Sequence, residues 1–114
     1  VVLDSATLLT MMFQEEHEKR RILFLMSNAV KKAGATSIFT GESKPENPMV
    51  SRDGLLEYVA DGVILLNQIP LKEKYELRLV LQILKMRRTN HSRKMHPFYI
   101  GEKGIEVLAD VDLL

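Results

Sequence analysis

The chain has 114 residues, of which 46% are apolar, so it is long enough for one domain and too apolar to remain disordered. Sixteen basic residues against fifteen acidic ones leave a net charge of +1, so the overall balance demands neither nucleic acid nor an anionic membrane as partner. The sequence has no cysteine, which excludes disulfides and thiol nucleophiles, and no apolar run of bilayer length; we therefore expect a cytoplasmic protein with no membrane partner.

The first 40 residues have the pattern of a strand, a helix and a second strand. An apolar β-branched run at residues 1–3 ends in Asp4 and Ser5, which is typical of a buried strand. Residues 14–33 have the three-to-four periodicity of an amphipathic helix, and Gly34 should end it before a strand at residues 35–40. The apolar face of this helix comprises Ile22, Leu25, Met26, Ala29, Val30 and Ala33. The order predicts a right-handed βαβ unit with parallel pairing.

The remaining residues read as a loop, a short helix and several strands. Residues 41–53 contain one glycine, two prolines and five charged residues, so we expect a mobile surface loop there. A helix at 54–59 precedes four strands, which we place at 62–66, 75–87, 97–101 and 105–108. In the longest strand the alternation predicts a core face made of Leu77, Leu79, Leu81 and Ile83. The chain should be one α/β domain over residues 1–114, with a parallel start and an antiparallel C-terminal meander.

Two cations close the longest strand. Lys85 and Arg87 lie two residues apart, so both should project from the same face of the strand. Two positive charges held at a strand end form a plausible receptor for phosphate. The alternative is a solvated basic strand end, and the spacing by itself leaves both interpretations open.

Several short motifs together resemble the C-terminal half of a KaiC-like ATPase domain of the RecA superfamily. In chain order they are Asp4-Ser5, Thr40-Gly41-Glu42, E-x-x-A-D-G-V-I-x-L at 57–66, I-L-K-M-R at 83–87, P-F-x-I at 97–100 and G-I-E-V at 104–107. Each motif is weak, but their shared order is hard to obtain by chance. The resemblance implies a partial RecA-like sheet and an ATP-binding domain that is a regulatory or signalling ATPase when complete.

The resemblance also implies roles for particular residues. Asp4 would be the Walker B carboxylate that holds Mg²⁺ through its water shell, with Ser5 and Thr40 beside the bound ATP. Glu42 would stand at the sensor position that detects the terminal phosphate. Lys85 and Arg87 would reach the nucleotide bound to a neighbouring subunit, which requires a homo-oligomer. Without the resemblance, Asp4 or Ser5 would be a helix cap, and Thr40 and Glu42 ordinary polar residues at a loop entrance.

Two departures from the family pattern limit this interpretation. No glycine stands in a G-x-x-x-x-G-K-[ST] phosphate-binding loop, so we expect ATP hydrolysis only if an upstream half supplies one. Arg88 occupies the position where the family usually has glycine, which puts the aim of Arg87 in doubt. His91 matches a histidine of the family pattern, but a lone histidine predicts no particular chemistry.

Self-association is the expected partnership, as hexamers in the family and as a dimer for this fragment, because an unpaired apolar strand invites association. One alternative function is a RadA-like recombination or repair factor that binds single-stranded DNA through the loop carrying Lys44 and Arg52. That loop has no aromatic residue to stack on a base, so nucleic acid is not favoured. Another alternative is a catalytically dead oligomerisation module.

Overall fold

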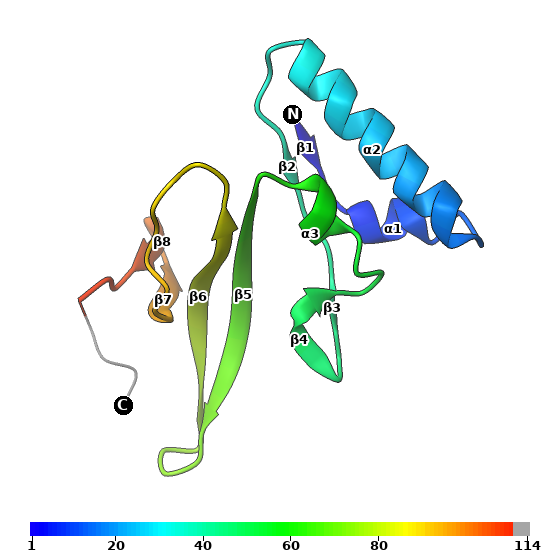
Figure 1. The fold of residues 1–114 in the computed structure, drawn as a ribbon. Coiled ribbons are helices and arrows are strands. Elements are labelled where there is room, and N and C mark those ends of the chain that lie inside the picture. The colour runs from blue at the N-terminus through cyan, green and yellow to red at the C-terminus, as the bar shows by residue number, and fades with distance from the viewer. Residues whose placement is uncertain (111–114) are drawn as a thin grey trace. The chain divides into compact units, whose positions relative to one another are not determined.

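The computed structural model describes residues 1–110, which form two compact units (Figure 1). The first unit, Val1–Ala60, contains β1 (Val2–Leu3), α1 (Ala6–Thr10), α2 (Glu16–Lys32), β2 (Ile38–Phe39), β3 (Ser43–Lys44), β4 (Asn47–Ser51) and α3 (Leu56–Val59). The second unit begins at Asp61 and contains β5 (Gly62–Leu71), β6 (Glu76–Met86), β7 (His96–Gly101) and β8 (Gly104–Val107).

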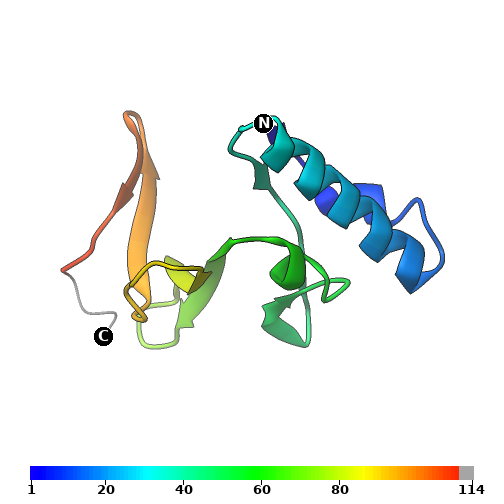
Figure 2. The ribbon, with the colours of Figure 1, turned by 45° about the horizontal axis from the view of Figure 1, so that its top comes forward.

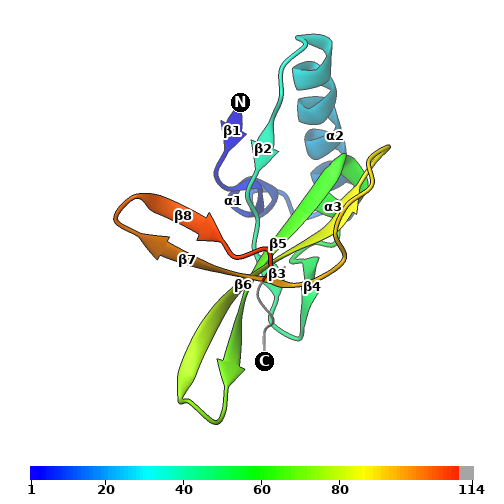
Figure 3. The same cartoon turned by 90° about the vertical axis from the view of Figure 1, so that its left-hand side faces the viewer.

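The first unit begins with the expected βαβ arrangement. Strands β1 and β2 pair in parallel, with Val2 opposite Ile38 and Leu3 opposite Phe39. Figure 3 shows the two strands side by side, with α2 connecting them. Acidic residues in the first turn of α2 and basic residues in its last turn complement the helix dipole. Both strands are only two residues long, so the second is shorter than the strand expected at 35–40.

The buried face of α2 differs from the one that the sequence predicts. Leu23 is fully buried and packs with Ala6 and Leu55 in the core of this unit, and α1 lies beside the first turns of α2 (Figure 2). Leu25, which we expected to be buried, is 51% exposed. Leu23 and Leu25 lie on nearly opposite sides of the helix, and both sides carry apolar residues. The position of α1 and of the segment before α3 selects the side that contains Leu23.

The segment at 41–53 is not the structureless loop that the composition indicates. It folds back on itself as an antiparallel hairpin of β3 and β4, with Ser43 opposite Ser51 and Lys44 opposite Asn47. Proline at position 48 lies in the second of these strands, where a short two-stranded ribbon tolerates a missing N–H donor. The sequence analysis also did not predict α1, whose five residues are too few to produce a periodic pattern.

The second unit is the expected antiparallel meander, with the strand order β5-β6-β7-β8. Strand β5 extends to Leu71, five residues beyond its predicted end, because Pro70 continues the ladder opposite Leu77 at the edge of the sheet. The pairing shifts by one residue near the other end, where Val63 lies opposite Lys85 and Ile64 opposite Ile83.

The predicted core face of β6 is only half-buried, and the most buried residue of the strand lies on the other face. Val80, from the opposite face, is the residue of this strand that is buried, whereas Leu77 is 61% exposed. The reason is the pairing with β7, which places Val80 opposite Pro97 and next to the buried Phe98. Alternation identifies two faces of a strand, and the neighbouring strands decide which one is covered. None of the described helices is both long enough and apolar enough to cross a membrane.

Candidate functional site

Asp4 and Thr40 follow the two parallel strands of the first unit and lie in contact. The carboxyl ends of parallel neighbours meet at one edge of a sheet, which is where ligands of open α/β sheets usually bind. The Thr40 hydroxyl donates a hydrogen bond of 2.5 Å to Oδ1 of Asp4. Backbone bonds hold Thr40 to the segment around Asp4: the Thr40 amide donates to the Leu3 carbonyl at 3.0 Å, and the Ala6 amide donates to the Thr40 carbonyl at 2.7 Å.

Asp4 is exposed to solvent, and Oδ1 is the carboxylate oxygen that Thr40 contacts. Among the residues that the structure describes, Oδ2 has no hydrogen-bond partner. Ser5 follows through a cis peptide bond, and its hydroxyl accepts the Leu8 amide at 3.2 Å as the N-cap of α1. The capping role that we considered for Ser5 is therefore present. The Asp4 carboxylate keeps one oxygen facing water.

Glu42 is held near this edge by its backbone and by its side chain. Its amide donates to the hydroxyl of the buried Thr7 at 2.9 Å, so the first turn of α1 fixes its main chain. Its carboxylate forms an ion pair with Arg52 at 3.2 Å, and the Arg52 amide donates to the Glu42 carbonyl at 2.8 Å. Arg52, which we considered as a contact for nucleic acid, is thus tied to the predicted sensor residue.

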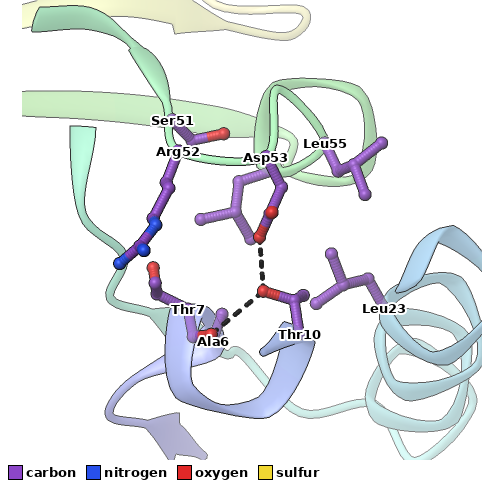
Figure 4. A pocket seen from close by; sticks show the side chains of 9 residues that line it. Ala6, Thr7, Thr10, Leu23, Ser51, Arg52, Asp53 and Leu55 are labelled. Atoms are coloured by element: carbon purple, nitrogen blue, oxygen red, sulfur yellow. Dashed lines mark hydrogen bonds between the residues drawn. The ribbon is translucent and has the colours of Figure 1, made fainter. Parts of the chain in front are cut away.

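A polar cluster beside α1 joins three segments of the first unit, and Figure 4 shows its contact between Thr10 and Asp53. The buried Thr10 hydroxyl lies in hydrogen-bond contact with the Asp53 carboxylate and 3.0 Å from the Thr7 carbonyl oxygen. Asp53 also pairs with Lys19 of α2 at 3.2 Å, and both side chains are less than one-fifth exposed. The sequence analysis missed this cluster because its three polar residues are widely separated along the chain. It holds α1, and with it the backbone that follows Asp4.

Arg87 lies just beyond the end of β6, and Asp61 binds it twice. The Arg87 amide donates to the Asp61 carbonyl at 2.8 Å, and its guanidinium Nη1 lies 3.0 Å from Oδ1 of Asp61. Lys85 lies opposite Val63, directly after the shift in register near the end of β6. Such irregularities redirect the side chains that follow them. Asp61 belongs to the 57–66 motif, but nothing in that motif indicated a partner 26 residues away.

Arg88 follows in a left-handed backbone conformation with φ of 59°. It is the third residue of a turn that a hydrogen bond of 3.4 Å from the Thr89 amide to the Met86 carbonyl closes. A positive φ at this place is the arrangement that usually requires glycine. Glycine adopts this conformation without strain, which explains why glycine suits the position. In this chain Arg88 adopts the same left-handed conformation.

The six predicted site residues fall into the two units. Asp4, Ser5, Thr40 and Glu42 belong to the first unit, and the structure brings them to one edge of its parallel sheet. Lys85 and Arg87 belong to the second unit, at the open end of the β5–β6 hairpin. Their roles stay predictions.

A model of a protein family described as "ATPase: KaiC" matches residues 1–112. The chain belongs to the KaiC family of ATPases. It is 32% identical over 109 residues to the circadian clock oscillator protein KaiC of Prochlorococcus marinus and 34% identical over 107 residues to that of Synechococcus elongatus. These alignments cover 96% and 94% of this chain but only 21% and 20% of those proteins. The chain spans about a fifth of the length of the KaiC proteins it matches.

Its fold is similar to the crystal structure of a KaiC-like protein from the hyperthermophilic archaeon Pyrococcus horikoshii. The TM-score is 0.80 at 36% sequence identity, and the match covers 94% of this chain and 47% of that one. Membership of the KaiC family and the mixed α/β fold, which the sequence motifs predicted, are thereby confirmed.

Proposed function

We propose that residues 1–114 are the C-terminal half of a KaiC-type ATPase domain, which binds ATP and Mg²⁺ together with an upstream half that carries the phosphate-binding loop. The complete protein would act as a regulatory or signalling ATPase. The observation that carries the proposal is the contact between Thr40 and Asp4, at 2.5 Å, across the ends of two parallel strands. That edge is where open α/β sheets bind their ligands.

The donor set at this edge fits a hydrated magnesium ion. Mg²⁺ takes one or two carboxylates, keeps several waters and completes its shell with substrate phosphates. Asp4 offers one exposed carboxylate, with Oδ1 oriented by Thr40 and no described partner on Oδ2. Asp4 would hold the ion through water, and the ion, when bound, would neutralise phosphate charge. Thr40 would orient the carboxylate and Glu42 would respond to the terminal phosphate.

Lys85 and Arg87 would act on a nucleotide held by another subunit. Cations aimed at a transferring phosphoryl group stabilise the charge that develops in the transition state. Arg87 is suited to that task because Asp61 fixes both its backbone and its guanidinium, which reduces the freedom that the side chain loses on binding phosphate. This role makes the active site depend on a homo-oligomer.

The test is ATP hydrolysis by the chain joined to the upstream part of its reading frame. We expect Mg²⁺-dependent turnover there, and a loss of about a hundredfold or more in kcat for Asp4→Asn and for Arg87→Ala. Glu102→Gln, which removes a carboxylate at the exposed β7–β8 turn, is the matched control and should leave kcat unchanged.

Mixing the two inactive variants separates action between subunits from action within one. An oligomer containing both Asp4→Asn and Arg87→Ala subunits has some sites with an intact Asp4 and an intact Arg87 from different chains. We expect part of the activity to return on mixing. Failure to regain activity, in oligomers shown to exchange subunits, would contradict the proposed role of Arg87 between subunits.

A further inference from the structure

Arg88 has a backbone conformation that glycine, which lacks a side chain, adopts most easily. Its φ of 59° lies in the left-handed region, where a Cβ atom approaches the following carbonyl and raises the free energy of the folded chain. Glycine would adopt the same turn without that cost. A residue held in such a conformation is a reason to look for a function that its side chain serves.

The described part of the chain provides no contact that would offset this cost. Arg88 is exposed, and among residues 1–110 its guanidinium has no hydrogen bond and no ion pair. The neighbouring Arg87 is different, since Asp61 binds its amide and its guanidinium. A contact with a group outside the described residues, such as a bound anion, would account for an arginine at this position.

The local charge indicates what that contact would be. Between Glu76 and Glu102 the sequence has six Lys and Arg residues and no Asp or Glu. Described carboxylates that contact this segment are Asp61, paired with Arg87, Glu76, paired with Arg78, and Glu106, bonded to the Tyr99 hydroxyl. At the turn itself, an anionic group meets Lys85, Arg87 and Arg88 close together in the sequence, and the described carboxylate paired there is Asp61. The planar guanidinium of arginine binds two phosphate oxygens in parallel, which suits it to this anion.

We propose that Arg88 is a further phosphate-binding residue, acting beside Lys85 and Arg87 on the polyphosphate of the nucleotide. The proposal rests on the proposed function of this strand end. Asp61 holds Arg87 in place, and Arg88 supplies an additional guanidinium directly after it. The conformational cost at Arg88 is then offset when phosphate binds.

The test uses the ¹⁵N-labelled chain, titrated with inorganic tripolyphosphate and followed by amide and arginine side-chain NMR signals. We expect Arg88→Gly to weaken binding about tenfold, as for the loss of a charge-assisted contact to phosphate, and Arg88→Lys to weaken it less. Lys103→Gln removes one charge at the distant β7–β8 turn and should change affinity by less than about twofold at moderate salt.

Urea unfolding gives the second measurement. Arg88→Gly should unfold at a higher urea concentration than the parent chain, because glycine adopts the positive φ without strain.

Opposite changes in stability and affinity distinguish a functional arginine from an incidental one. Equal affinity losses in Arg88→Gly and Lys103→Gln would show a bulk charge effect and overturn the proposal, as would unchanged binding in Arg88→Gly. If Arg87→Gln loses binding while Arg88→Gly keeps it, Arg88 has no role but the strand end still binds phosphate. If tripolyphosphate does not bind the parent chain, or Arg87→Gln leaves binding unchanged, the phosphate-binding role of this strand end fails too.

Discussion

Tyr99 and Glu106 form a pair across β7 and β8, where they lie directly opposite each other in the register. The Tyr99 hydroxyl donates a hydrogen bond to the Glu106 carboxylate. That hydrogen bond, followed by desolvation and by repulsion from the Glu106 charge, raises the pKa of Tyr99 above its ordinary value of 10.0. The neutral phenol is the form that donates. The pair therefore stabilises the fold fully at pH values below 10.0, and its contribution is lost as the pH rises through the higher folded-state pKa.

Absorbance titration of the phenolate tests this pair. The difference between the parent chain and Tyr99→Phe isolates the ionisation of Tyr99 from that of the other two tyrosines. We expect its midpoint to fall to lower pH in Glu106→Gln, because the carboxylate acceptor and its charge are both removed. An unchanged midpoint in Glu106→Gln would show that the hydrogen bond does not form in solution.

The single residues of the candidate site were partly predictable. Asp4 and Thr40 follow apolar runs that the sequence marks as parallel strands, so their proximity at one sheet edge was foreseeable. The pairing of Glu42 with Arg52 depends on the hairpin of β3 and β4, which the glycine and proline content of that segment conceals. The left-handed conformation of Arg88 was not predictable from the sequence, and only the backbone angle in the structure shows it.

Among the elements, α2 shows most clearly what a periodic pattern does not decide. Leu23 and Leu25 are two positions apart on one helix, so they lie on nearly opposite sides of it. Leu23 is buried against Ala6 and Leu55, whereas Leu25 is half exposed. Because apolar residues occur on both sides, periodicity identifies an amphipathic helix but does not by itself choose the side that is buried. The neighbours of the helix make the choice.

Truncation of each leucine measures the difference. Leu23→Ala should lower the free energy of unfolding by about 2–5 kcal/mol, because it leaves a cavity in the core of the first unit. Leu25→Ala is the matched control on the same helix, and we expect a change of no more than about 0.5 kcal/mol. Urea unfolding monitored by circular dichroism provides both values. A larger effect at Leu25 would restore the face that the sequence predicted.

At the scale of the whole molecule, the parallel sheet of the first unit has only two described strands. Val2 and Ile38 on these strands, and Val1 just before them, are each more than 60% exposed. Apolar side chains on a short, open sheet favour association with another chain, which agrees with the dimer that we predicted from the sequence. The second unit builds its own four-stranded sheet and does not need such a partner to complete its ladder.

Sedimentation velocity tests this association directly. We expect the chain to form a dimer or a larger species, and Val2→Lys to shift it towards monomer by placing a charge on the exposed strand. Lys103→Gln, at a turn of the second unit, should sediment like the parent chain. A clean monomer at high concentration would argue against association through this sheet.

The sequence by itself determined the order of elements, the parallel start, the antiparallel meander and membership of the KaiC family, because apolar runs and short ordered motifs are local properties of a chain. The tertiary structure decided which faces are buried and which charges are paired. Leu23 rather than Leu25 entered the core because of the segments packed on α2, and Val80 rather than Leu77 because of β7. Asp61 holds Arg87 because the pairing of β5 and β6 places Gly62 opposite Met86, and such contacts between distant residues follow from the assembled fold.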